Sequence, residues 1–390
     1  MKRFIVLFVS VLLLVCMFAI TFSTNTTAGE KEVEYKNWVD MQPPVTPGIK
    51  ICALMVYDTE SDKIILFGGF TGERGSDETW AYDYETNTWT NMKPDPHPPG
   101  RFGPGFVYDP KRDLCILYGG MDSYQGNSTY FDDTWTYDYN SNTWTQLSPT
   151  ASPSKRCKGG TAYDIKSEQM VWFGGYGPDG VNKDETWTFN LDENTWVNKT
   201  SDVRPPARKR NPLMYDEQSD LVVMFGGWKG GEEVFNDLWV YDFNSNTWTE
   251  KDFTGGPHKR CRYGRAYIPE RDVIVYTHGY GGVDGDMDDT WAYDCNENTW
   301  SKVEMTGTPP AKRHCFQVAY NEKHDVIIFQ GGSSASAYDD TFAFKPYDPL
   351  PEEEEEASPV VIFAIVGIVA FIILIIIIII VIKIRKNAED

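Results

Sequence analysis

Basic residues recur in pairs, two positions apart, at regular intervals through the middle of the chain. The pairs are Arg156 and Lys158, Arg208 and Arg210, and Arg260 and Arg262. Guanidinium and ammonium groups bind carboxylates and other anions. The 390-residue chain around them is acidic, with 57 Asp and Glu against 36 Lys and Arg. We therefore expect these six residues to bind an anion or an acidic partner.

Histidines and carboxylates nearer the C-terminus offer a second chemistry. The candidate metal ligands are His278, His314, Asp284, Asp286 and Asp288. Imidazole with carboxylate holds transition metals, and carboxylates alone hold calcium. The segment "DGDMDD" lacks the glycine and the closing Glu of an EF-hand loop. We therefore expect no cofactor, with a metal ion as the alternative.

Other catalytic patterns are absent from the sequence. It has no Gly-x-Ser-x-Gly, no phosphate-binding loop and no paired zinc cysteines. The net charge of −21 argues against nucleic-acid binding, which needs clustered positive charge. These observations favour a binding protein over an enzyme.

The basic pairs belong to an internal repeat of about 50 residues. Each period has an apolar run that ends in Gly-Gly, such as "ILFGG" at 65, although His278 replaces a glycine in the fifth. A tryptophan follows Asn-Thr at Trp89, Trp144, Trp196, Trp248 and Trp300. A tyrosine also recurs once in each period, at Tyr57, Tyr108, Tyr163, Tyr215, Tyr267 and Tyr320.

Each period contains four strand-like segments, which in the first are "CALMVYD", "KIILFGG", "ETWAYDY" and "NTWTNM". The second is apolar on both faces, so both faces must be covered. Radial stacking of four-stranded sheets does this. The sequence thus predicts an all-β fold, a six-bladed β-propeller over residues 29–345.

The ends of the repeat array predict how the ring closes. The last period stops at "DDTFAF" without an Asn-Thr-Trp strand, whereas Trp38 stands in "KNWVDM" before the first period. We expect this N-terminal strand to complete the last blade, because an open ring would leave sheet edges unpaired.

The Gly-Gly after an apolar strand, the Tyr-Asp pair (Tyr82-Asp83 in the first period) and the tryptophan after it resemble kelch repeats, as in galactose-oxidase-like central domains. The resemblance covers about 36–345 and rests on sixfold recurrence. It implies that the innermost strands line a channel, and that ligands bind on the face formed by the loops before these strands and between second and third strands. That face would hold the basic pairs and the acids Asp77, Asp132, Asp184, Asp237, Asp288 and Asp339.

A structural alternative exists for each of these sets of residues. The first basic positions are Lys50, Arg101, Arg156, Arg208, Arg260 and Arg313, and ion pairs between blades would occupy them. Two residues on, Cys52, Gly103 and Cys315 replace the second base in the other periods. Strand alternation would put both members of a pair on one side, so blades three to five would direct charge to one sector of the mouth. We expect the aromatic rows to pack between blades, with sugar stacking as the alternative.

Apolar segments at both ends predict export and anchoring. Residues 1–28 carry Lys2 and Arg3 before an apolar run and resemble a signal peptide. Residues 346–359 are a Pro/Glu-rich stalk, and the apolar segment 360–382 is long enough for a transmembrane helix. Basic residues in 383–390 predict a cytoplasmic tail, and hence a single-pass membrane protein with the propeller outside the cell.

Export bears on cysteines and glycosylation. We expect free or buried thiols, because strands of neighbouring blades lie about 10 Å apart, too far for a Cys52–Cys315 disulfide. Asn127 and Asn198 stand in Asn-x-Ser/Thr sequons, in expected loops, and are candidates for glycosylation.

The sequence therefore indicates a membrane-anchored extracellular kelch propeller that binds a protein or an acidic glycan or peptide at the channel mouth. A carbohydrate-active enzyme, a sugar oxidase or an epimerase, is the first alternative. A structural component of a surface coat is the second.

Overall fold

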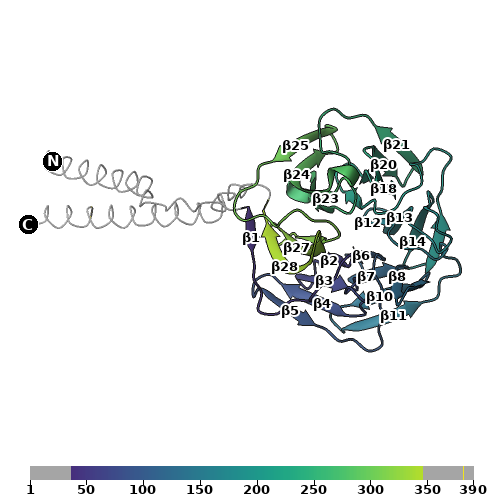
Figure 1. Ribbon diagram of the computed structural model, residues 1–390, viewed down its shortest axis with the longest axis horizontal. Helices are drawn as coiled ribbons and strands as arrows, with labels where there is room; N and C mark the ends of the chain where they lie inside the picture. The colour runs from purple at the N-terminus through teal and green to yellow at the C-terminus, as the bar shows by residue number, and fades with distance from the viewer. Residues whose placement is uncertain (1–36, 346–380, 382–390) are drawn as a thin grey trace, which may run out of the picture. The chain divides into compact units, whose positions relative to one another are not determined.

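The computed structural model describes residues 37–345 and residue 381. Over 37–345, six four-stranded antiparallel sheets surround a central channel (Figure 1). In each of these sheets, here called blades, the first strand lies innermost at the channel. The predicted all-β six-bladed propeller is confirmed.

The blades follow one another along the chain. Blade one comprises β2 (Leu54–Asp58), β3 (Lys63–Phe67), β4 (Thr79–Asp83) and β5 (Thr88–Asn91); blade two comprises β6 (Gly105–Asp109), β7 (Leu114–Tyr118), β10 (Thr134–Asp138) and β11 (Thr143–Leu147). Blade three comprises β12 (Gly160–Asp164), β13 (Gln169–Phe173), β14 (Thr186–Asn190) and β15 (Thr195–Asn198); blade four comprises β16 (Leu213–Asp216), β17 (Leu221–Phe225), β20 (Leu238–Asp242) and β21 (Thr247–Lys251).

Blade five comprises β22 (Gly264–Ile268), β23 (Val273–Tyr280), β24 (Asp286–Asp294) and β25 (Thr299–Val303). Blade six comprises β26 (Gln317–Asn321), β27 (Val326–Ser333), β28 (Ala337–Phe344) and the N-terminal β1 (Trp38–Asp40). Two hairpins, β8 (Met121–Tyr124) with β9 (Asn127–Tyr130) and β18 (Trp228–Gly230) with β19 (Glu233–Val234), extend from blades two and four. Two short 3-10 helices, η1 (Pro269–Arg271) and η2 (Gly282–Asp284), lie in blade five.

The N-terminal strand closes the ring, as predicted. β1 pairs with β28, with Trp38 opposite Phe344 and Asp40 opposite Phe342. Trp38 is 1% exposed, and its ring stacks on that of Phe344 with centroids 4.3 Å apart. Blade six is therefore built from both ends of the segment 37–345.

The core lies between the blades. Ile64 and Leu66 of β3 are fully buried and pack in one cluster with Val326 and Ile328 of β27. Ile65 and Phe67 of β3 alternate with them and lie on the other face, where they pack against blade two. The second strands are thus covered on both faces, as their uniform hydrophobicity requires.

The tryptophan row also makes a hydrogen bond across each of four junctions. Each indole Nε1 donates to a threonine of the third strand of the preceding blade: Trp89 to Thr341, Trp144 to Thr79, Trp196 to Thr134 and Trp248 to Thr186, at 2.8–3.0 Å. In blade four, Leu238 takes the place of the threonine. The buried Nε1 of Trp300, in the next blade, therefore has no partner among the described residues. The aromatic row therefore packs between blades, as expected.

The repeated Tyr-Asp pair and the Asn that follows it build the turn between the third and fourth strands of a blade. Tyr82 donates to Asn87 Oδ1 at 2.8 Å, and Asn87 adopts a φ of 50°. Asn87 Nδ2 then donates to the carbonyl of Met41 in the preceding blade, at 2.6 Å. Asparagine tolerates the left-handed conformation better than most residues, which explains its recurrence at this position.

The flanking predictions concern other parts of the chain. The signal peptide 1–28, stalk 346–359 and tail 383–390 lie outside the described residues, as does the segment 360–382 apart from Val381. Where the structure does describe the chain, it contains no helix that is long and apolar enough to cross a bilayer.

Closure through β1 predicts a large effect of Trp38→Ala. Removing this buried side chain should lower the free energy of unfolding by about 3–5 kcal/mol. Val39→Ala is the matched control, because Val39 is 45% exposed on the same strand. Chemical denaturation followed by circular dichroism measures both. Equal stabilities of the two variants would contradict closure by β1.

The indole–threonine bonds predict a different cost for two threonines of β10. Thr134→Val leaves the buried Trp196 Nε1 without an acceptor and should cost about 1–3 kcal/mol. Thr136→Val is the control, since Thr136 is buried in the same strand and does not bond an indole. Leu238 shows that an apolar side chain fits at the first position. If both variants unfold at the same denaturant concentration, the bond is unimportant for stability.

Candidate functional site

The residues two positions after each basic residue form a ring around the channel mouth. This mouth ring consists of Cys52, Gly103, Lys158, Arg210, Arg262 and Cys315, all with φ of 55–59°. Backbone hydrogen bonds of 2.6–3.1 Å join five successive pairs, with the nitrogens of Cys52, Gly103, Lys158, Arg210 and Cys315 as donors. These residues lie in the loops that lead into the innermost strands, and their left-handed backbone brings neighbouring blades into contact.

The first basic positions are buried within their own blades. Arg208 is fully buried, and its two terminal nitrogens each lie 2.6 Å from an oxygen of Asp237. The equivalent pairs are Lys50–Glu78, Arg101–Asp133, Arg156–Glu185, Arg260–Asp289 and Arg313–Asp340. Arg156, Arg208 and Arg260 therefore do not present charge at the mouth, which corrects the expected six-residue site.

Two further details of this row differ from expectation. The ion pairs lie within blades, because the loop before the innermost strand passes beside the loop before the third strand of the same sheet. The acid is the residue directly before the threonine, so in five of the blades it stands one position after the predicted one. The contact between blades comes from the backbone, where the Arg101 carbonyl accepts from Gly69 at 2.9 Å.

The second basic positions keep their charge at the mouth. Lys158, Arg210 and Arg262 are half-buried, and within residues 37–345 none of them forms an ion pair with a carboxylate. Burial lowers the pKa of Lys158, and the charge of Arg210 lowers it further. Three adjacent blades thus hold cations close together, and residues 37–345 supply no carboxylate to pair with them. They precede the strands, so strand alternation does not describe their direction.

Aromatic rings flank these cations. The Arg262 guanidinium lies 4.5 Å from the ring centroid of Trp228 in β18. Lys209, beside Arg210, lies 3.7 Å from Tyr176 and 4.8 Å from Trp228. Burial, and then the charges of Lys158 and Arg210, lowers the pKa of Lys209 to about 8. The sector combines positive charge with flat apolar surface.

The remaining three mouth-ring residues are a glycine and two cysteines. The Cys52 nitrogen donates to the Cys315 carbonyl at 3.0 Å. Their separation was expected to be that of strands in neighbouring blades. The two cysteines precede the strands, so the spacing of strands in neighbouring blades does not apply to this pair, although both are free as expected. All six cysteines in the described part of the chain are unbridged.

The candidate metal ligands do not come together in one group. His278 is fully buried, with its ring against Trp38 and Phe316, and burial lowers its pKa to about 4. His314 instead bonds Asp286 at 2.6 Å and Arg262 at 3.1 Å. Asp284 lies 4.0 Å from Lys259, and Asp288 lies 3.7 Å from Lys312. This differs from the predicted metal site.

A different acid and histidine group has the spacing of a metal site. Ligand atoms of Asp62, Glu85 and His324 lie within 4.8 Å of one another. Lys323 also contacts Asp62, at 2.8 Å, so ion pairs account for the group.

Both predicted glycosylation sites are exposed. Asn127 begins β9 and Asn198 ends β15, so they stand at strand ends and not in the expected loops. Glycosylation itself remains a prediction.

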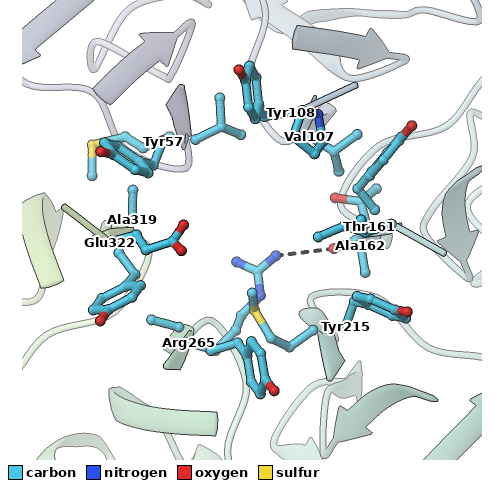
Figure 2. A pocket seen from close by; sticks show the side chains of 18 of the residues that line it. Tyr57, Val107, Tyr108, Thr161, Ala162, Tyr215, Arg265, Ala319 and Glu322 are labelled. Atoms are coloured by element: carbon cyan, nitrogen blue, oxygen red, sulfur yellow. Dashed lines mark hydrogen bonds between the residues drawn. The ribbon is translucent and has the colours of Figure 1, made fainter. Parts of the chain in front are cut away.

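The channel below the mouth ring contains a residue that the sequence reasoning missed. A cavity of about 560 Å³ is lined by the inner strands, including the repeated tyrosines, and Arg265 of β22 extends into it (Figure 2). Arg265 donates to the carbonyls of Leu213 at 2.9 Å and Thr161 at 3.3 Å. Burial lowers its pKa, and the described residues supply no carboxylate to pair with it. The sequence did distinguish Arg265, because the equivalent residues of the other five inner strands are uncharged.

Acidic groups stand at the other end of this cavity. Glu217 and Glu322 belong to its lining, and Figure 2 shows Glu322. Burial, together with the charge of Glu322, raises the pKa of Glu217. The channel therefore carries positive charge at the mouth and at Arg265, and negative charge beyond.

Comparisons with known proteins agree with this architecture. A family model described as the KLHDC2/KLHL20/DRC7 Kelch-repeats domain matches residues 32–201 and 159–349. An F-box/kelch-repeat protein of Arabidopsis thaliana is 27% identical over 262 residues, which cover 60% of this chain and 52% of that protein. Acyl-CoA-binding domain-containing protein 5 of the same plant is 26% identical over 239 residues, 58% of this chain and 35% of that protein. The aligned part is thus about half or less of these relatives. The matches to the family model together span most of the chain, and the chain belongs to the kelch-repeat family.

Proposed function

We propose that this propeller is a protein-interaction module whose mouth binds an acidic segment of its partner. Lys158, Arg210 and Arg262 would contact the acidic groups, and Trp228 would contact the adjoining apolar surface. The observation that carries the proposal is the absence of a carboxylate counter-charge, among residues 37–345, at these three neighbouring cations.

The electrostatics of the free protein support an acidic ligand. Charged groups held together away from water are costly unless opposite charge compensates them. Lys158 and Arg210 already repel each other, since the charge of Arg210 lowers the pKa of Lys158. A bound carboxylate would relieve this repulsion. The net charge of −21 would disfavour an acidic partner elsewhere and direct it to the mouth.

The architecture supports a protein partner. The mouth sector combines guanidinium groups with Trp228 and Tyr176, and arginine, tryptophan and tyrosine are the residues that dominate protein interfaces. The name of one relative also combines kelch repeats with an F-box. An acidic glycan would satisfy the charges but needs fewer apolar contacts, so we commit to an acidic peptide.

We also propose that the propeller is exported and held at the membrane by residues 360–382. The support is the sequence pattern alone, namely the basic and apolar start, the long apolar segment and the basic residues after it.

Charge reversal at the mouth tests the binding site. Lys158→Glu, Arg210→Glu and Arg262→Glu together should weaken binding of a hexaglutamate peptide by ~100-fold or more, because three attractive contacts become repulsive. Isothermal titration calorimetry measures the dissociation constant, and wild-type binding should weaken as salt rises.

A charge-matched control is available on the exposed surface. Lys93→Glu, Lys166→Glu and Lys302→Glu change the net charge equally and should alter binding less than ~3-fold, since these lysines are exposed. Equal losses in both triple variants would reject the site. Tighter binding of polygalacturonate than of the peptide would indicate a glycan ligand.

The proposed topology has a direct test in cells. Antibody against the propeller should stain intact cells, whereas a tag after Asp390 should require permeabilisation. The reason is that the basic residues after the apolar segment retain the tail in the cytoplasm. The reverse staining pattern, or no propeller staining before permeabilisation, would contradict export.

A further inference from the structure

Two thiols from the first and last blades meet at one guanidinium group. Nη1 of Arg210 lies 3.1 Å from Cys52 Sγ and 2.9 Å from Cys315 Sγ. Cys52 precedes blade one, Cys315 precedes blade six, and Arg210 reaches them from blade four. The Cys52–Cys315 backbone hydrogen bond holds the two main chains together at 3.0 Å. The standard backbone bonds on either side of that hydrogen bond limit the separation of the two Cα atoms to about 7 Å, which is near the reach of a disulfide.

The two thiols differ in acidity. The hydrogen bond from the Cys315 thiol holds the pKa of Cys52 well below its usual value, burial opposes this, and the charges of Arg210 and Lys158 add to the lowering. Burial raises the pKa of Cys315, which is 6% exposed, and Cys52 raises it further. Of the two thiols, Cys52 therefore loses its proton more readily to form the thiolate, which is the reactive form of cysteine.

The groups facing this pair come from every adjoining blade. Besides Arg210, they are Lys158, Arg262, His314 and the buried thiols Cys157 and Cys261. The cations outnumber the other charges, so the environment favours a thiolate.

A small cavity gives access to the pair. It has a volume of about 100 Å³, and Cys52, Cys315 and Arg210 contribute to its lining. Cys52 itself is partly exposed. This space admits a small oxidant, whereas a bulky one would meet the mouth ring.

We propose that Cys52 and Cys315 form a reactive dithiol that hydroperoxides oxidise to a disulfide. The Cys52 thiolate attacks the terminal oxygen of the peroxide, an S–O bond forms and the O–O bond breaks, and the departing alkoxide or hydroxide takes a proton to leave as an alcohol or water. The Cys315 sulfur then attacks the sulfenic acid on Cys52, an S–S bond forms and the S–O bond breaks, and the hydroxyl leaves with a proton as water. One peroxide is reduced by two electrons, and two thiols become one disulfide.

The remaining cysteines provide an internal comparison. Burial raises the pKa of Cys115 and Cys157, that of Cys261 to about 11 and that of Cys295 to about 12. Desolvation keeps these thiols protonated and slow to react. Reactivity should therefore be confined to the mouth. A disulfide there would add a covalent link between blades one and six, which closure through β1 already joins non-covalently.

Mass spectrometry of the reduced full chain after hydrogen peroxide treatment tests the proposal. A Cys52–Cys315 cross-linked peptide should appear, and Cys295→Ser should leave its rate of formation unchanged. With Cys315→Ser, a sulfenic acid should persist on Cys52 and be trapped by dimedone. Appearance of the cross-link with dimedone trapping of Cys52 supports the proposal, and a chain that shows neither product overturns it.

The contribution of Arg210 has its own readout, which loss of packing alone would not produce. In Arg210→Met, the pH at which Cys52 reaches half-maximal alkylation by iodoacetamide should rise, and its rate at pH 6.5 should fall ~10-fold or more. Arg210→Lys should restore part of the rate. The protein without substitutions provides a test that does not depend on how the variants fold. In it, iodoacetamide should alkylate Cys52 faster than Cys295. Equal reactivity of these two cysteines, or an unchanged pH profile in Arg210→Met, would overturn the proposal.

Discussion

The left-handed turn at the mouth ring is the constraint on which the site depends. Six residues adopt φ of 55–59°, although only Gly103 is free of the steric penalty for this conformation. Hydrogen bonds to neighbouring blades offset that penalty. The turn brings six side-chain positions close to the axis of a channel that the blades would otherwise leave open. The ring is held by backbone hydrogen bonds, so its side chains can differ from blade to blade. Three of them are cationic and two are thiols.

The buried basic residues explain how the turn is held. Arg101 bonds Asp133 through its side chain within blade two, while its carbonyl accepts from Gly69 of blade one. A Cβ on the neighbouring Gly68 would stand 2.6 Å from that carbonyl oxygen, which explains the Gly-Gly row. Burial would raise the pKa of Asp133, but the bonds and charge of Arg101 together with the bond from Trp135 lower it. One residue thus joins two loops of its own blade to the blade before it.

Much of the fold was predictable from the sequence because repetition amplifies weak signals. Six copies of an apolar strand required six blades, and the missing outer strand assigned Trp38 to blade six. The site was less predictable, because its geometry depends on backbone that precedes the strands. Strand alternation gave Arg208 and Arg210 a common direction, whereas the turn between them buries the first and brings the second to the axis. The proximity of Cys52 and Cys315 was missed for the same reason. Arg265 was overlooked because its position, unlike the basic rows, is not itself a repeat motif, although its charge distinguishes it from Leu213 and Val318 at equivalent positions.

Shared construction of blade six has a consequence for the order of the chain. The nitrogen of Lys345 donates to the carbonyl of Asn37 at 2.8 Å, so the first and last residues of the propeller, 37–345, are neighbours. A short linker between them would close the polypeptide with little loss of loop entropy. New termini could then be opened in any exposed turn between blades, giving circular permutants with the same contacts. The packing of the six blades therefore does not depend on which turn carries the two termini.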